Sequence, residues 1–146
     1  MCLYIHTDSK IQIAKKDILV YKVLDIDNEN HYFTPYQYYP IRFVGKRFRY
    51  NSKIGEPVVD YGICGKSYIE EGIHTYTKPT THYTCLFKTT CCYAVIPKGS
   101  KYYISCNGEE CVSNCLIIFK DKEEYELYKK EVKTNFIKKI IHWFMS

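Results

Sequence analysis

The segment 91–119 constrains the fold of this chain more than any other, because turn signals separate its short apolar runs. Asn107-Gly108 is typical of a two-residue type I′ hairpin, in which both central residues take positive φ. In such a hairpin Ile104 lies opposite Cys111, and both side chains share one face of the ribbon. The segment therefore predicts antiparallel strands on both sides of residues 107–108.

A second turn signal precedes this hairpin at residues 97–100, Pro-Lys-Gly-Ser. Proline presets φ for the first corner, and glycine takes the left-handed position without strain. Residues 92–96 are therefore expected to pair with residues 101–104. Together the two turns predict a short antiparallel meander.

The rest of the chain up to residue 120 predicts further short strands. Residues 18–26 form a β-branched run that is expected to be a central strand, and residues 42–50 and 73–77 alternate as strands do. Residues 67–72 are predicted to form one helical turn, with serine at its start and glycine at its end. We expect a mostly antiparallel, twisted sheet of short strands.

Residues 121–144 predict one long C-terminal helix. Apolar side chains recur there every three or four residues, acidic side chains fill the first turns, and lysines follow. We expect this amphipathic helix to cover one face of the sheet, because an antiparallel sheet needs something to bury its apolar side. The alternative is a basic helix that lies on a membrane surface, with Trp143 and Phe144 inserted. The predicted class is α+β.

Length and composition favour a single domain, residues 1–146, since 17.4 kDa with 46% hydrophobic residues is enough for one core. The N-terminus does not resemble a signal peptide, and no apolar run is long enough to span a bilayer. We therefore expect a cytoplasmic protein without a membrane partner. In that compartment the eight cysteines are expected to be packed thiols, because their spacing lacks the Cys-x-x-Cys pairs of structural zinc. No metal and no cofactor is predicted.

The candidate binding site combines a tyrosine-rich stretch with the basic strand that follows it. Aromatic faces stack on nucleobases, while arginine and lysine side chains bind phosphates, so the combination suits a nucleotide or single-stranded nucleic acid. A histidine and a tyrosine in the strand 73–77 are added, because the histidine can point into a cleft beside the tyrosine; the favoured alternative for the histidine is a satisfied side chain in a strand. The predicted ligand-binding residues are Tyr36, Tyr38, Tyr39, Arg42, Arg47, Arg49, His74 and Tyr76. The alternative is that the tyrosines pack on the sheet and the arginines are only solvated.

An enzymatic alternative places an ADP-ribosyltransferase-like site around Tyr21, His74 and either Glu124 or Glu126. The two glutamates have the spacing of the acidic pair in such enzymes, but they fall in the first helical turns. Compensation of the helix dipole explains them better. No feature selects one cysteine and one histidine as a catalytic pair, so no catalytic residue is predicted.

Four segments carry a resemblance to a known group. They are residues 13–24, 71–76, 95–103 and 112–118, about a third of the chain. They resemble segments of small uncharacterised proteins encoded by bacteriophages and mobile elements of gut anaerobes. That group has no settled catalytic motif, so the resemblance implies an origin and a fold, with the host cytoplasm as the location.

Together these expectations define a first functional hypothesis. The protein is a non-enzymatic phage accessory protein that binds a small phosphorylated, nucleotide-like ligand and thereby sequesters a signal of bacterial antiviral defence. The alternatives are an inhibitor that binds a host defence protein through the tyrosine-rich loop, the ADP-ribosyltransferase-like enzyme, and a nucleic-acid-binding protein. Exposed strand edges would also suit a homo-oligomer.

Overall fold

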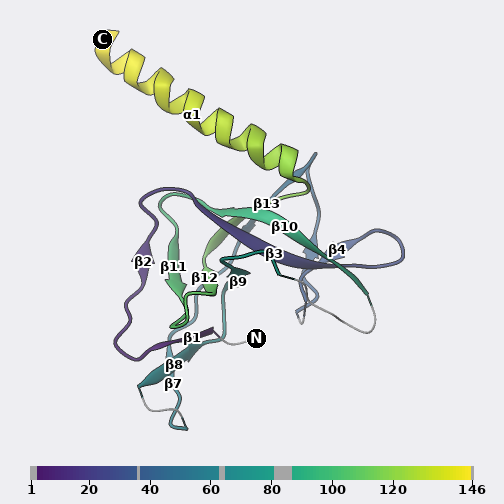
Figure 1. Ribbon diagram of the computed structural model, residues 1–146, viewed down its shortest axis with the longest axis vertical. Helices are drawn as coiled ribbons and strands as arrows, with labels where there is room; N and C mark the ends of the chain where they lie inside the picture. The colour runs from purple at the N-terminus through teal and green to yellow at the C-terminus, as the bar shows by residue number, and fades with distance from the viewer. Residues whose placement is uncertain (1–2, 36, 63–64, 81–86, 146) are drawn as a thin grey trace.

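The structure, a computed structural model, describes residues 3–35, 37–62, 65–80 and 87–145. Within them, two antiparallel sheets and one helix are arranged along the chain (Figure 1), so the predicted α+β class is confirmed. The helix α1 spans Lys122–Met145, as its apolar periodicity predicted.

The larger sheet has ten strands among the described residues. Its main path follows the order β2 (Gln12–Ile13), β11 (Lys101–Ile104), β12 (Glu110–Ser113), β9 (Ile73–Tyr76), β3 (Ile18–Ile26), β10 (Lys88–Ile96), β13 (Cys115–Phe119) and β6 (Arg47–Asn51). Two short strands lie off this path, because β4 (Tyr32–Phe33) pairs with β3 and with β5 (Pro40–Ile41). The smaller sheet has the order β1 (Leu3–His6), β8 (Lys66–Ile69) and β7 (Val58–Val59).

Strands β3 and β10 form the spine of the larger sheet. They pair along their whole length, from Lys88 opposite Ile26 to Ile96 opposite Ile18. β3 also pairs with β9 and β4, so the prediction of a central strand at residues 18–26 is confirmed. Long β-branched strands with neighbours on both edges are typical of the middle of a sheet.

The larger sheet is so strongly curled that side chains on its inner face pack against one another. In Figure 1, β3 and β10 run across the view while β2 and β11 run along its vertical, which shows how strongly the strand direction turns. Val20 and Leu24 of β3 share one buried cluster with Ile73 of β9, Tyr50 of β6 and Leu116 of β13. Strong twist and coiling bring the two ends of an antiparallel sheet over its centre. The main core is therefore built almost entirely from strands and the loops between them.

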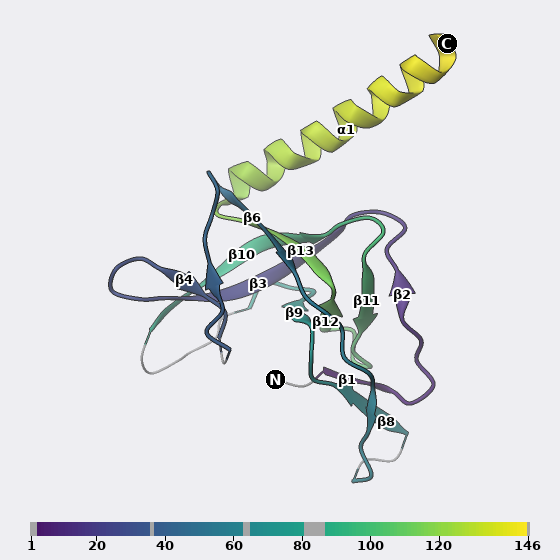
Figure 2. The same ribbon diagram turned by 180° about the vertical axis from the view of Figure 1, so that it is seen from behind.

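Helix α1 does not cover the sheet, which corrects the expected packing. Its first turns contact the outer face, where Tyr125 is buried beside Phe119 and Val95, and the rest projects away from the body (Figures 1 and 2). The prediction assumed that the apolar face of the sheet needs a helix. The curled sheet supplies that cover itself, so only the outer face near β13 remains for α1.

The second cluster joins the two sheets. Leu3 and Ile5 of β1 and Ile69 of β8 pack against Tyr103 of β11 and Val112 of β12. The backbone amide of Cys106 also donates to the carbonyl of Tyr4. The smaller sheet is thus attached to the end of the larger one where β11 and β12 meet.

The hairpin prediction is correct in its strands and wrong in its turn type. Ile104 lies opposite Cys111, as expected. The turn is longer than two residues, because the amide of Ser105 bonds the carbonyl of Glu110 and positive φ is found at Gly108 but not at Asn107. The Asn107 side chain instead accepts bonds from the Ser105 hydroxyl and the Glu109 amide, which stabilises the longer turn.

Three further expectations are corrected. The turn at residues 97–100 forms, with Gly99 at φ 89°, but β11 leaves β10 and pairs with β2 and β12. The Ala14 amide donates to the carbonyl of Ser100, and the Gly99 amide donates to the carbonyl of Ala14. These two bonds hold the turn and direct the chain away from β10. Residues 66–69 form strand β8 instead of a helical turn, since pairing with β1 and β7 overrides the local capping signal. The strand expected at 42–50 is confined to β6.

Candidate functional site

The largest hollow beside the tyrosine-rich loop, called here the tyrosine hollow, has a volume of about 710 Å³. Strands β4 and β5 form one side, the loop after β5 forms another, and the residue that follows β13 closes it. Its lining is Asn30, His31, Tyr32, Phe33, Tyr38, Pro40, Ile41, Arg42, Phe43, Gly45 and Lys120. Aromatic rings and cations dominate this set, and no carboxylate belongs to it.

The aromatic rings that line the tyrosine hollow pack against one another. Tyr32 and Phe43 meet edge to face with ring centroids 5.3 Å apart, and Phe33 lies 6.0 Å from Tyr38. Lys120 Nζ lies 5.9 Å from the centroid of the Tyr32 ring. Such contacts fix the orientation of the rings and leave part of each ring face accessible.

Two cations in this hollow are available to an anion. In the described part of the chain, no ion pair involves Arg42 or Lys120, whereas His31 at the rim lies near Asp27 and Glu29. Arg42 is exposed, and its guanidinium can form two parallel hydrogen bonds with one phosphate or carboxylate. The hollow is therefore electrostatically suited to an anionic group.

Tyr38 projects into this hollow from a backbone conformation that a bulky residue rarely adopts. Its φ is 53°, and its side chain is 60% exposed. The loop is closed around the buried Thr34: the Tyr38 amide donates to the Thr34 carbonyl, and the Tyr39 amide donates to Thr34 Oγ1 at 3.0 Å. A left-handed non-glycine residue costs of order 1–3 kcal/mol and persists only where its surroundings enforce it. These bonds enforce the position of the Tyr38 ring.

A second, smaller cavity of about 40 Å³ lies on the other side of the same loop, and Lys22 lines it. Lys22 is only 9% exposed, and its Nζ donates to the carbonyl of His74 at 2.7 Å. Lys22 belongs to none of the ion pairs among the described residues, and burial lowers the pKa of its amine to about 8. The cavity, called here the lysine cavity, therefore contains an ammonium group at the edge of the main core.

His74 and Tyr76 of β9 also line the lysine cavity. His74 Nε2 lies 3.0 Å from the carbonyl of Glu70, which can only accept, so this nitrogen carries the hydrogen. Burial, together with the nearby charge of Lys22, lowers the pKa of His74. The imidazole is therefore neutral at pH 7 and fixed in one tautomer.

The eight predicted ligand-binding residues are divided between several places. Tyr38 and Arg42 lie in the tyrosine hollow, and His74 and Tyr76 lie in the lysine cavity. Tyr39 stacks on Tyr50 with centroids 4.7 Å apart, and Tyr36 lies outside the described residues. The predicted set is thus not one continuous surface.

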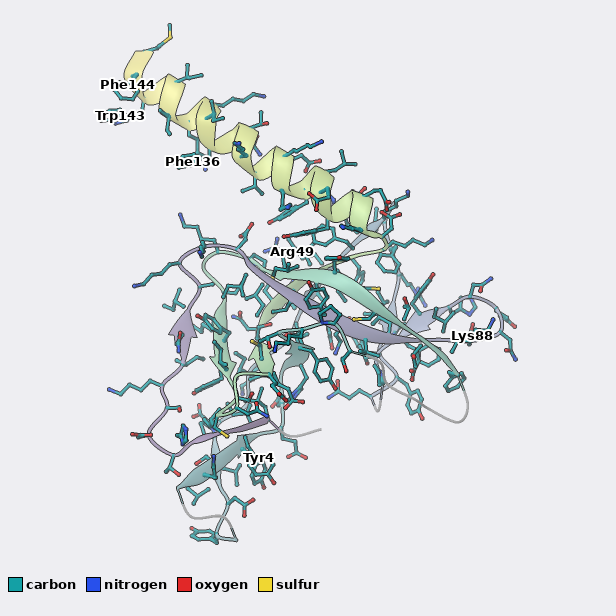
Figure 3. All side chains as sticks on the ribbon, in the orientation of Figure 1. Tyr4, Arg49, Lys88, Phe136, Trp143 and Phe144 are labelled. Carbon is teal, nitrogen blue, oxygen red and sulfur yellow. The ribbon has the colours of Figure 1, made fainter. Side chains whose placement is uncertain are left out.

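Arg47 fastens helix α1 to strand β6. Its Nε donates to Glu124 at 2.7 Å, and its two terminal nitrogens form a bidentate pair with Glu131 at 2.9 and 3.0 Å. The guanidinium also lies 5.5 Å from the ring centroid of Tyr128. Arg49 lies on the same side, between the sheet and α1 (Figure 3). These two arginines face the helix and do not line the tyrosine hollow.

The residues of the enzymatic alternative are not brought together. Tyr21 packs on Tyr93, with centroids 5.3 Å apart, on the outer face, whereas His74 faces the inner cavity. Glu124 is bound to Arg47, and Glu126 pairs with Lys129 on the helix surface. Neither of the two glutamates therefore lies beside His74.

The five described cysteines are free thiols, four of them in strands and Cys106 in the turn between β11 and β12. Burial raises the pKa of both Cys92 and Cys111 to about 11, so both are protonated at neutral pH. Among residues 3–35, 37–62, 65–80 and 87–145, no group of three potential metal ligands converges. The same residues contain no helix with the length and apolar character needed to cross a bilayer.

Comparison of the chain with protein-family models, with curated proteins and with solved structures found no match.

Proposed function

We propose that this protein binds a small phosphorylated, nucleotide-like ligand in the tyrosine hollow. The observation that supports it is the coincidence of about 710 Å³ of open space with exposed aromatic faces and two cations, Arg42 and Lys120, that form no ion pair among the described residues. Ligand pockets usually measure about 300–1,000 Å³ and combine apolar walls with a few polar anchors. A mononucleotide or cyclic nucleotide has the matching chemistry.

Each part of such a ligand has a partner in the tyrosine hollow. The base stacks against the exposed ring of Tyr38, and the phosphate binds Arg42 and Lys120. Stacking on an aromatic side chain contributes about 1–3 kcal/mol per base. The left-handed backbone of Tyr38 supports this role, because strained residues cluster at ligand-binding positions.

Sequestration is the activity that fits a hollow without a catalytic group. The described lining has no carboxylate, and its histidine lies at the rim near Asp27. A role in removing a signal of antiviral defence depends in addition on the resemblance to phage-encoded proteins. The ligand-binding proposal does not require that origin.

Calorimetric titration of the purified protein with AMP, ADP, ATP and cyclic adenine and guanine nucleotides tests the proposal. We expect saturable binding of at least one nucleotide and a loss of about tenfold or more in the Arg42→Ala variant, since a charge-assisted bidentate contact contributes about 1.5–3 kcal/mol. Arg49→Ala is the matched control, because it removes the same group from the side of the sheet that faces α1. No heat and no thermal shift with any nucleotide would remove the proposal.

A second candidate function is the binding of a host protein. The exposed rings of Tyr38 and Tyr39 favour it, because aromatic side chains dominate interface hot spots. Pull-down with wild-type and Tyr38→Ala protein separates the two functions. A protein captured only by the wild type, with no nucleotide bound in calorimetry, would support this candidate over the first.

A further inference from the structure

The distal part of helix α1, residues 132–145, extends beyond the body of the protein. The last polar contacts with the sheet come from Tyr128, which donates to Asp17, and from Glu131, which binds Arg47. Beyond them Val132 and Phe136 still line a hollow of about 660 Å³ together with Leu19 and Val95, and the rest of the helix projects away from the body (Figures 1 and 2). Its large apolar side chains are exposed, with Trp143 at 72% and Phe144 at 74%. Helices this short are marginal in water unless an apolar face is packed.

Seven of the eight large exposed apolar side chains of this segment gather on one side of the helix, and Met145 is the exception. At 3.6 residues per turn, six of them fall within an arc of roughly 140°, and Ile141 extends it to about half the circumference. The six are Val132, Phe136, Ile137, Ile140, Trp143 and Phe144. Figure 3 shows Phe136, Trp143 and Phe144 along the projecting half of the helix. The side chains of this face are 40% to 74% exposed.

The charge of the segment has one sign. Residues 132–145 contain Lys133, Lys138 and Lys139 and no aspartate or glutamate. The acidic residues of α1 lie in its first half, where Glu124 and Glu131 bind Arg47. Lys138 falls opposite the centre of the apolar arc, and Lys139 lies at its edge, next to Val132. A surface that covers this helix must therefore accept apolar side chains and also carry negative charge.

We propose that residues 132–145 of α1 lie in the interface of an anionic lipid bilayer, with the apolar arc buried and the lysines directed to the headgroups. A wide apolar arc accompanied by lysines, with a terminal tryptophan, is typical of helices that lie in the plane of a membrane. Lys133, which falls within the apolar arc, can extend its amine to the headgroup level.

The observations favour lipid over a second copy of the chain. A helix pair that buries the apolar arc would place Lys133 in the seam, where residues 132–145 offer no acidic side chain to pair with it, whereas anionic lipids attract it. An arc of this width also exceeds the narrow seam that a helix pair buries. The sequence argument against a membrane helix was that the sheet needs α1 as a cover, and the curled sheet removes that argument.

Tryptophan fluorescence gives a direct test, because Trp143 is the only tryptophan of the chain. The full-length protein is mixed with vesicles of phosphatidylcholine alone or of phosphatidylcholine with phosphatidylglycerol. We expect a blue shift and protection from acrylamide quenching with the anionic vesicles, and much less of either with the neutral ones. Equal binding to both would refute the role of the lysines. Continued quenching with both would overturn the proposal.

Variants tested in a vesicle sedimentation assay separate insertion of the helix from non-specific adsorption of the protein. Lys138→Gln combined with Lys139→Gln should weaken binding about 30-fold, because each lysine near an anionic surface contributes roughly fivefold. Trp143→Ser with Phe144→Ser should also weaken it, whereas Tyr61→Ser, which removes a fully exposed ring elsewhere, should not. A protected tryptophan in the absence of vesicles, with twice the monomer mass in light scattering, would assign the face to a second copy and contradict the proposal.

Discussion

Replacing Lys22 with methionine should stabilise the protein at pH 7, and the gain should shrink as the pH rises. Lys22 lies on β3 with Val20 and Leu24, whose side chains are fully buried in the main core. Its only hydrogen bond among the described residues goes to the carbonyl of His74. Methionine has a similar length and fills irregular apolar space without a charge.

The magnitude follows from the pKa of the Lys22 amine. Burial lowers this pKa from 10.5 to about 8. At about 1.36 kcal/mol per pKa unit, the charged amine costs the folded state roughly 3.4 kcal/mol at pH 7. Loss of the donor to the His74 carbonyl offsets about 1–3 kcal/mol of that. A net gain of about 1 kcal/mol in the free energy of unfolding is therefore expected.

The sign of the pH dependence is opposite to that of a lysine with a carboxylate partner. Below pH 8 the Lys22 amine is protonated in both states, so the full cost is present. Between pH 8 and 10.5 the unfolded state binds more protons than the folded state, so wild-type stability rises relative to the variant. The advantage of the variant should therefore fall by about 1.4 kcal/mol between pH 7 and pH 9.

Urea unfolding of both proteins at pH 7, 8 and 9 measures this difference. The difference in stability between the two proteins cancels the contributions of tyrosine and cysteine titration, because both proteins contain the same tyrosines and cysteines. Lys53→Met, at an exposed lysine, is the control and should change stability by less than about 0.5 kcal/mol. A Lys22→Met variant that is less stable by the same amount at every pH would refute the reasoning, because it would show that the amine keeps its ordinary pKa in the fold.

Three other predictions concern the framework. Gly72→Ala should lower the free energy of unfolding by about 1–3 kcal/mol in urea titration, because φ is 143° and a Cβ would lie 2.4 Å from Val112 Cγ2; an unchanged midpoint would contradict the close packing. Cys92 and Cys111 should react with iodoacetamide at pH 8 at least about 100-fold more slowly in the folded than in the unfolded protein, since their pKa values rise from 9.0 to about 11; equal rates in mass spectrometry would show exposed thiols. Arg47→Ala should release the first turns of α1, so their amide hydrogen exchange should rise several-fold.

Local signals in the sequence were sufficient for the elements with strong periodicity. The strand at 18–26 and the pairing of Ile104 with Cys111 were predicted correctly, and the helix expected over residues 121–144 spans Lys122–Met145. The type of the turn at 107–108 was not, because Asn107 uses its side chain to stabilise a longer turn. That choice depends on bonds to Ser105 and Glu109 in addition to the two central residues.

The position of α1 was not predictable from its own apolar stripe. The stripe shows only that one face seeks an apolar environment, and it does not identify what supplies that environment. Arg47 illustrates the same limit for the site, because its carboxylate partners are 77 and 84 residues away in the chain. A basic strand next to a tyrosine-rich loop did indicate the place of the tyrosine hollow, through Tyr38 and Arg42.

The sequence does contain a signal for the lysine cavity, although Lys22 was not among the predicted site residues. Side chains alternate across a strand, so Lys22 shares a face with Val20 and Leu24. A lysine at such a position in a central strand is either paired or placed at a cavity. The assignment of residues 1–146 to a single domain, the phage origin and the cytoplasmic location stay predictions.

The account depends most on the claim that the tyrosine hollow holds a phosphorylated ligand, and amide chemical shifts of ¹⁵N-labelled protein titrated with the nucleotide panel test it directly. The claim predicts saturable shifts at residues 30–33, 38–45 and Lys120, with no change at Lys53 or along residues 132–145. Absence of shifts with every nucleotide, or saturable shifts confined to residues outside the hollow, would contradict it.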